Sequence, residues 1–246
     1  MINKDLTVII SSCDDYNILW DDFYKCFKAN WGIDCEIIFI SESKNNSNFK
    51  TITPGFKPWG QRQLEALNEV KTELVFWLLD DYFLCYKYSP HIFEKYINDF
   101  FKMDMDRLQI SPDNYIDGKF HFERNNTKLH TESKYEMIDC NLEYSVTLQP
   151  SIWRKSYIKK ILQKEYSPWD FEIKGSKMNK SKKVYIDRSI KYLPYFNAVR
   201  KKNFITISRI IRFLDKLILK IFYNKLPFKY SKGYNKFFKN KSYIDE

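Results

Sequence analysis

Short buried strands alternate with amphipathic helices through the first eighty residues, and this alternation constrains the fold more strongly than any other feature of the chain. Aliphatic and β-branched runs predict strands at residues 6–11 (LTVIIS), 35–41 (CEIIFIS) and 73–79 (ELVFWLL). Apolar residues at helical spacing predict helices over 18–29 and 59–70. This order is typical of an α/β fold, in which helices cover the faces of a largely parallel sheet.

The rest of the chain continues this alternation less regularly. The expected elements are a helix at 90–103, a short strand at 108–111, strands and loops over 112–140, a strand at 145–149, a helix at 153–164 and a helix that begins within 167–172. The 246 residues therefore fit one large α/β domain, residues 1–200, followed by a helical tail, residues 201–246.

Charge is distributed unevenly along the chain. Residues 1–150 carry 16 Lys and Arg against 24 Asp and Glu, a net charge of −8, whereas residues 151–246 carry 25 against 7, a net charge of +18. A basic half of this kind favours anionic partners, which include phosphates, nucleic acid and anionic membranes.

The tail is the most basic part of the chain, with 13 Lys and Arg and one acid over residues 200–241. Its segment ITISRIIRFLDKLILKIFY places apolar residues on one helical stripe and basic residues on the other side. This pattern predicts an amphipathic helix that lies on an anionic membrane surface. The alternative is a C-terminal helix that packs on the sheet with its charges solvated.

The sequence also indicates where the protein is located. No segment reaches the roughly 18 apolar residues that a spanning helix needs, and the N-terminus lacks a signal-peptide pattern. The five cysteines are scattered without a CxxC pair, which indicates reduced thiols rather than disulfides or a zinc site. We expect a cytoplasmic protein that is peripheral on the inner face of the cell membrane.

Two adjacent carboxylates follow the third expected strand. Asp80 and Asp81 come directly after ELVFWLL, at the edge where open α/β sheets bind their ligands. Adjacent carboxylates repel each other, and a divalent cation with its phosphates offsets that repulsion. The alternative is a solvated acidic turn.

The segments LTVIIS, EIIFIS and QRQLEALNEVKTELVFWLLDDYFL resemble the first half of a GT-A fold glycosyltransferase, of the nucleotide-sugar-dependent, family-2-like type that builds bacterial surface glycans. The resemblance covers roughly residues 5–175 and implies a Rossmann-type mixed sheet flanked by helices. In that fold a helix with an arginine and an amide residue precedes a strand that ends in a DxD motif. Arg62 and Gln63 fall on this helix.

The resemblance also implies roles for the acidic pair and for the first loop. Asp80 and Asp81 match the last two positions of the DxD motif, whereas Leu79 departs from the first. Asp81 would then hold Mn²⁺ or Mg²⁺, with Asp80 on the donor side. Such enzymes bind the nucleotide just after the first strand. The residues at that place in this chain are Ser11, Ser12 and Asp14.

The segment SPWDFE combines helix-start chemistry with candidate catalytic carboxylates. Asp170 in the first helical turn has a structural explanation in the helix dipole and a functional one as a general base. Asp170 and Glu172 are two residues apart and cannot share one helix face. We favour Asp170 as the base, with Glu172 as the other candidate, and Trp169 as an apolar platform for a sugar ring.

We interpret the segment QPSIWR as an acceptor-binding loop. It places Gln149 and Trp153 between a strand and a helix, and the alternative is a plain turn with a core Trp153. His121 and His130 are candidate metal ligands that we leave out of the metal site, because a lone histidine is more often structural.

Together these features predict an inverting glycosyltransferase that moves a sugar from a nucleotide-sugar donor to a glycan or lipid-linked glycan acceptor. The alternative of another class is a nucleic-acid-binding protein that uses the basic, aromatic-rich C-terminal half. It explains the tail but not the acidic pair, so no nucleic-acid partner is expected. A nucleotidyltransferase would carry a glycine-rich loop where this chain has SSCDDYN.

Overall fold

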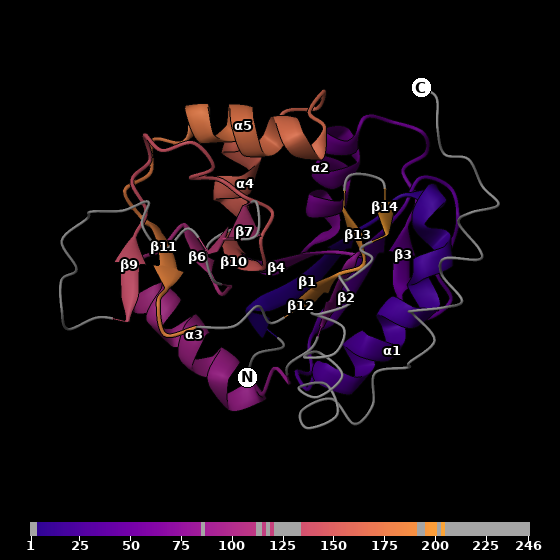
Figure 1. Cartoon of the computed structure of the whole chain (residues 1–246), viewed down its shortest axis with the longest axis horizontal. Coiled ribbons are helices and arrows are strands. Elements are labelled where there is room, and N and C mark those ends of the chain that lie inside the picture. Colours follow the sequence, from indigo (N-terminus) through magenta and orange to yellow (C-terminus); the bar gives the residue numbers. More distant parts are fainter. Residues whose placement is uncertain are drawn as a thin grey trace.

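The computed structural model describes residues 4–84, 87–111, 134–190 and 195–200, and the short strands Tyr115–Ile116 (β7), Lys119–Phe120 (β8) and Asn203–Phe204 (β14). An eight-stranded mixed sheet in the order β3-β2-β1-β4-β10-β6-β11-β9 runs through its centre (Figure 1). Its strands are β1 Leu6–Ser11, β2 Glu36–Ile40, β3 Lys50–Ile52, β4 Leu74–Leu79, β6 Arg107–Gln109, β9 Tyr135–Met137, β10 Ser151–Arg154 and β11 Val184–Asp187. The expectation of a mixed α/β sheet is confirmed.

The N-terminal half of the sheet is parallel. β1 lies between β2 and β4, and Ile9 is paired with Ile38 on one side and with Trp77 on the other. All six residues of β1 are buried, as expected for a strand that is covered on both faces and therefore consists of one continuous apolar run.

The C-terminal half of the sheet is mixed. β10 is antiparallel to both β4 and β6, and β11 is parallel to β6. The carboxyl ends of β1, β4, β6 and β11 therefore share one edge with the amino end of β10. The prediction of a strand at 145–149 is wrong, because those residues form a loop. The strand β10 begins at Ser151, two residues beyond the predicted end.

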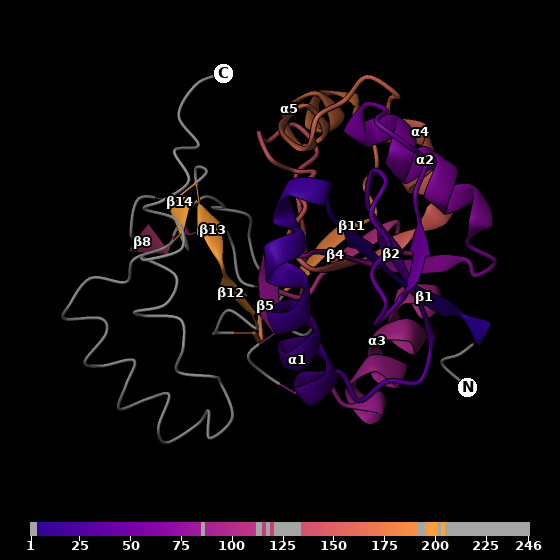
Figure 2. The ribbon, with the colours of Figure 1, turned by 90° about the vertical axis from the view of Figure 1, so that its right-hand side faces the viewer.

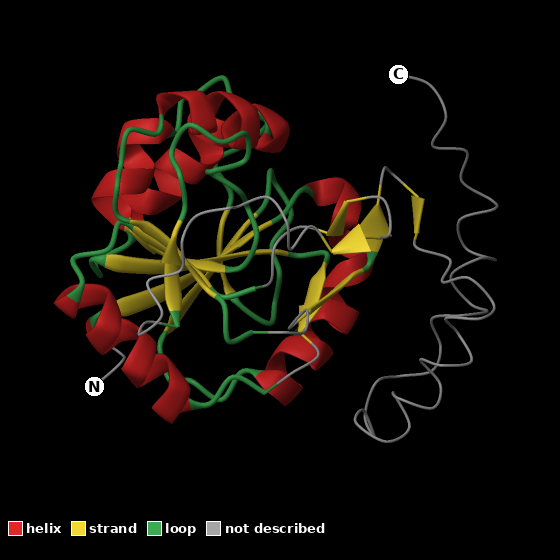
Figure 3. Ribbon diagram, turned by 60° about the vertical axis from the view of Figure 1, so that its left-hand side comes forward, coloured by secondary structure: helices red, strands yellow, loops and turns green. Residues whose placement is uncertain are grey.

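Helices cover both faces of the sheet, as Figures 1 and 3 show. Their bounds are α1 Trp20–Asn30, α2 Trp59–Glu69, α3 Pro90–Lys102, α4 Lys155–Ile161 and α5 Pro168–Met178, and a 3₁₀ helix, η2 Asp14–Leu19, precedes α1. The core between the sheet and α1 and α3 includes Phe23 and Phe93. The core on the other face, beneath α2, α4 and α5, includes Leu67, Ile158 and Phe171.

A small second sheet brings the C-terminal end of the described chain back to the end of β4. β5 (Tyr82–Leu84) is antiparallel to β12 (Tyr195–Asn197), and the Ala198 N–H donates to the Asp81 carbonyl oxygen over 2.8 Å. Figure 2 shows this pair beside α1. β13 (Val199–Arg200) then pairs with β14. The tail from residue 205 onward lies outside the described residues, as do His121 and His130.

Within the described ranges, no helix combines the length and the apolar character that crossing a bilayer requires.

Candidate active site

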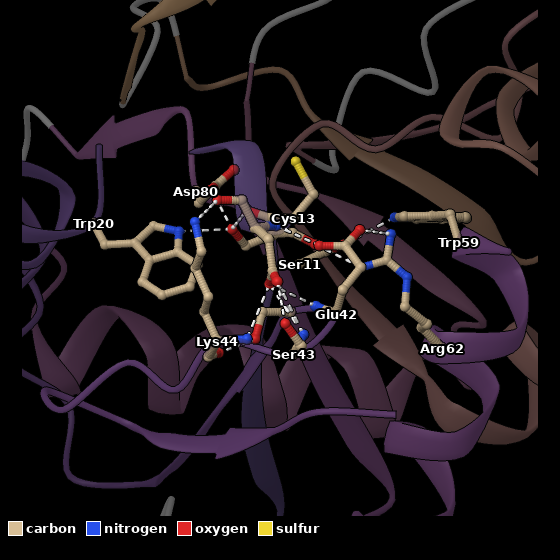
Figure 4. Close-up of polar contacts among 12 residues, drawn as sticks. Ser11, Cys13, Trp20, Glu42, Ser43, Lys44, Trp59, Arg62 and Asp80 are labelled. Atoms are coloured by element: carbon tan, nitrogen blue, oxygen red, sulfur yellow. Dashed lines mark hydrogen bonds and ion pairs between the residues drawn. The ribbon is translucent and has the colours of Figure 1, made fainter. Parts of the chain in front are cut away.

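The acidic pair ties the ends of β1 and β4 together. Asp80 is buried, and its carboxylate accepts a hydrogen bond from the Ser12 hydroxyl (Figure 4). The Trp20 Nε1–H donates to that hydroxyl over 2.8 Å, and the Asp80 N–H donates to the Ser11 carbonyl oxygen over 3.2 Å. These bonds fix Asp80 at the carboxyl end of β4, directly beside the end of β1.

The two carboxylates resist ionisation in the folded protein. Burial, together with the neighbouring Asp81 charge, raises the pKa of Asp80 well above its ordinary range. Burial raises the pKa of Asp81 to about 7. A pair of poorly solvated carboxylates is strongly stabilised by added positive charge.

Asp80 and Asp81 offer carboxylate oxygens, which are the ligands that a hard divalent cation prefers. Such an ion would also offset the repulsion between the two carboxylates. Among the described residues, no cluster of three or more His, Cys, Asp or Glu side chains could hold a metal without help. A bound diphosphate would therefore have to supply further oxygen ligands.

Asp14 organises the loop that follows β2. Its carboxylate accepts the N–H groups of Glu42, Ser43 and Lys44, each over 3.1 Å, and the Ser43 hydroxyl over 2.6 Å. Burial opposes ionisation of Asp14, but these hydrogen bonds outweigh it and lower the pKa. Asp14 therefore joins two loops at the sheet edge through a carboxylate whose ionised form these bonds favour.

Arg62 connects the same loops from α2. Its Nη1 donates to the Ser12 carbonyl oxygen over 3.1 Å, and its Nη2 forms a 2.8 Å ion pair with the Glu42 carboxylate. The other oxygen of Glu42 accepts the Asp14 N–H. Glu42 is a site residue that the sequence analysis missed, although it follows the second strand at the same sheet edge as Asp14 and Asp80.

Ser11 and Gln63, two residues that the sequence assigns to a donor site, lie deeper at this edge. The Trp59 Nε1–H donates to the Ser11 hydroxyl over 2.9 Å, which ties the start of α2 to β1. Gln63, one turn further along α2, is 0% exposed, and neither of its amide atoms has a hydrogen-bond partner in the described part of the chain. Gln63 thus lies behind the site surface.

The two candidate bases differ sharply in their surroundings. Asp170 forms a capping box with Ser167 at the start of α5 and a 2.7 Å ion pair with Lys174, and these contacts lower its pKa to about 2. Glu172 points inward, and its Oε1 accepts the Thr147 hydroxyl and the Leu148 N–H, each over 2.8 Å. Burial outweighs these bonds and raises the pKa of Glu172.

Two tyrosines connect Glu172 with the acidic pair. The rings of Tyr82 and Tyr195 stack with centroids 4.2 Å apart, and the Tyr195 hydroxyl donates to the Gln149 side-chain oxygen. Gln149 follows Leu148, whose N–H binds Glu172, so this chain of contacts leads from Tyr82, next to Asp81, to the loop that holds Glu172. The sequence gives no local signal for Tyr195, because β12 reaches the site only through its pairing with β5.

The two tryptophans of the expected acceptor side lie in different places. Trp153 is on β10 instead of in a strand-to-helix loop, and it is fully buried against Trp77 and Phe171. Its ring belongs to the core. Trp169 lies on the outer face of α5 and is 65% exposed.

The mixed sheet, the helices on both faces and the acidic pair beyond β4 together give this chain a GT-A-like fold. No family model matches the chain, and no curated protein matches it.

Solved structures similar to this chain include those of S. aureus TarS, a GT-A glycosyltransferase. One TarS structure aligns with a TM-score of 0.51 and 11% identity, over 79% of this chain and 37% of TarS. TarS 1-349 in complex with UDP-GlcNAc aligns with a TM-score of 0.50 and 13% identity, over 87% of this chain and 66% of that one. This chain therefore spans between about a third and two thirds of those proteins, and the likeness establishes the fold alone.

Proposed function

We propose that the protein is a glycosyltransferase that moves a sugar from a nucleotide-sugar donor to a glycan or lipid-linked glycan acceptor, with inversion at the anomeric carbon. The observation that carries the proposal is the carboxylate pair beyond β4, buried Asp80 and half-buried Asp81, at the edge where open α/β sheets bind ligands. The TarS complex with UDP-GlcNAc makes uridine nucleotides the first ligands to test.

The donor would lie over the ends of β1, β2 and β4. Asp14, Glu42 and Arg62 hold the loops that would contact the nucleotide, and Ser11 and Ser12 form the floor beneath them. Asp81 would hold Mn²⁺ or Mg²⁺, with Asp80 fixed behind it. Bound there, the ion would supply positive charge to the departing diphosphate.

Glu172 is the better of the two candidate bases in this proposal. Asp170 is engaged in its capping box and ion pair, and a carboxylate with a pKa of about 2 is a weak proton acceptor. The pKa of Glu172 is raised, and the loop that binds it also carries Gln149, which accepts from Tyr195. In the reaction, the acceptor hydroxyl oxygen bonds to the anomeric carbon, the bond to the diphosphate breaks, and the hydroxyl proton passes to Glu172.

Gln149 and Trp169 remain candidates for the acceptor side. Gln149 is held by Tyr195 at the amino end of β10, beside the loop that binds Glu172. Trp169 lies on the same helix as Glu172 but on its outer face, so it would contact an acceptor outside the immediate site. The tail would hold the protein on an anionic membrane where lipid-linked acceptors are found.

Ligand binding and turnover test this proposal in the full chain. UDP with Mn²⁺ should raise the melting temperature by mass action, and Asp81→Asn should remove that shift. Asp15→Asn is the matched control, because Asp15 is an exposed acid in η2, which follows the neighbouring strand β1. Hydrolysis of nucleotide sugars without acceptor should follow the same pattern. Absence of both signals with every nucleoside diphosphate, combined with oligonucleotide binding, would favour the nucleic-acid-binding alternative.

The choice of base is tested by comparing two variants. Glu172→Gln should leave nucleotide binding near normal and slow sugar transfer by roughly 100-fold or more, the usual effect of losing a general base. Asp170→Asn should lose only some helix stability. The reverse pattern would return the role to Asp170.

A further inference from the structure

Helix α5 presents two different faces. Its inner face packs on the sheet through Phe171 and Gly175 and directs Glu172 toward the site. Its outer side exposes two large apolar side chains, which we call the α5 patch: Trp169, 65% exposed, and Ile173, 43% exposed. Figure 1 shows α5 as the outermost helix on its side of the sheet.

Single exposed apolar side chains are common on soluble proteins and need no partner. Phe56, 82% exposed on the loop before α2, is such a residue. The α5 patch differs because Trp169 and Ile173 are four residues apart and therefore lie side by side on one face of the helix. Adjacent apolar side chains form a continuous surface rather than an isolated contact.

Exposed lysines accompany the α5 patch. Lys174 and Lys177 are exposed on α5, and Lys180 is exposed two residues beyond its end. Lys177 is four residues from Ile173 and therefore lies beside it on the helix surface. A partner that carries negative charge as well as apolar groups fits this face.

We propose that the outer face of α5 docks the protein onto an anionic lipid surface. Trp prefers the boundary between headgroups and acyl chains, Ile buries apolar area there, and each nearby Lys is attracted to acidic headgroups. Nucleic acid fits less well, because Ile cannot stack on bases as aromatic rings do. A specific protein partner would need about 800 Å² per side, more than these two side chains provide.

This docking surface is separate from the C-terminal tail and does not depend on the proposed catalysis. If the protein transfers sugar to a lipid-linked acceptor, docking through α5 would place the acceptor near Glu172, which the same helix carries. That consequence rests on the proposed function, whereas the docking itself is measured without substrate.

Tryptophan fluorescence in the full chain tests the proposal at the level of one side chain. The protein has six tryptophans, and the five other than Trp169 are at most 8% exposed. Vesicles with anionic headgroups and brominated acyl chains should therefore quench wild-type fluorescence through Trp169, and Trp169→Phe should abolish the quenching. This readout stays local to α5 even if the tail also binds the vesicles.

Two further variants test the charge and the apolar contact in the same vesicle assay. Lys177→Gln with Lys180→Gln should lower vesicle partitioning by roughly 5- to 30-fold, and added salt should reduce that difference. Ile173→Ser should weaken quenching, whereas Phe56→Ser, the matched control, should leave it unchanged. Binding to vesicles without quenching, equal binding to neutral vesicles, or a Trp169 signal only with oligonucleotides would each overturn the proposal.

Discussion

Asp81 links the chemistry of the site to the stability of the protein. Its pKa is about 7 in the folded state against an ordinary value of 3.8, so the folded protein binds the extra proton more tightly. The stabilisation from that proton is complete below about pH 4 and is lost as pH rises through 7. Without divalent ions, the site thus lowers stability at neutral pH.

Replacing Asp81 with Asn should remove this pH dependence. In EDTA, Asp81→Asn should match the wild-type free energy of unfolding near pH 4 and exceed it at pH 8, as measured by urea denaturation. Asp14→Asn should behave oppositely, because the pKa of Asp14 is lowered and its ionised form stabilises the fold above about pH 4. An Asp81→Asn variant that is less stable than wild type at pH 8 would contradict this account.

Gln63 gives a second prediction at this scale. Both of its amide atoms are buried without partners among the described residues, which costs roughly 1–3 kcal/mol. Gln63→Met should therefore raise the free energy of unfolding by about 1 kcal/mol or more. Gln61→Met is the control, since the Gln61 amide donates to Glu65 over 3.0 Å. A loss of UDP affinity in Gln63→Met would assign Gln63 to the donor side, as the sequence analysis expects.

Sequence patterns locate the acidic pair because position after a buried strand is a local property. The same patterns miss Glu42 and Tyr195, because their roles come from an ion pair with Arg62 and from the pairing of β12 with β5. They also favour Asp170 over Glu172, since only the folded chain shows which carboxylate is held in a capping box and which accepts from Thr147 and Leu148.

At the scale of elements, the start of α2 fits tightly against the loop before α5. The Gly60 N–H donates to the Tyr166 carbonyl oxygen, and a Cβ at Gly60 would lie 2.0 Å from the Gln163 carbonyl oxygen. Only glycine permits this approach.

Gly60→Ala should therefore destabilise the protein by roughly 1–3 kcal/mol or more, measured by denaturant unfolding. Gly175→Ala is the matched control within a helix, because its Cβ would meet nothing closer than 3.4 Å. That variant should be neutral or more stable, since Ala favours helix by about 1 kcal/mol over Gly. Equal effects of the two substitutions would show that the contact with Gln163 is relieved easily.

Strands and helices of the N-terminal half are predicted well, because their apolar runs are long and their caps are local. The strand predicted at 145–149 fails for a tertiary reason. Leu148 donates its N–H to the Glu172 carboxylate and Val146 donates to the Ser176 hydroxyl, so side chains replace the strand partners that the pattern implies.

For the whole molecule, the end of the α/β domain can be tested by truncation. β12 contributes Tyr195, which stacks on Tyr82, and the next residue, Ala198, donates its N–H to the Asp81 carbonyl oxygen. A chain that ends at residue 190 should melt on the order of 10 °C lower than the full chain. A chain that ends at residue 204 should keep its melting temperature and UDP binding but lose much of its affinity for anionic vesicles. Insolubility of the 204-residue chain would show that the tail packs on the sheet.

The position of β10 has a consequence for how the protein is made. β4 pairs with β1 early in the chain, but its other edge is covered only by residues 151–154. A nascent chain leaving the ribosome must therefore wait for about seventy more residues with an apolar strand edge open to other chains. Yield in a cell should thus depend on chaperones that shield this edge, and on the speed at which the ribosome delivers the strand that closes it.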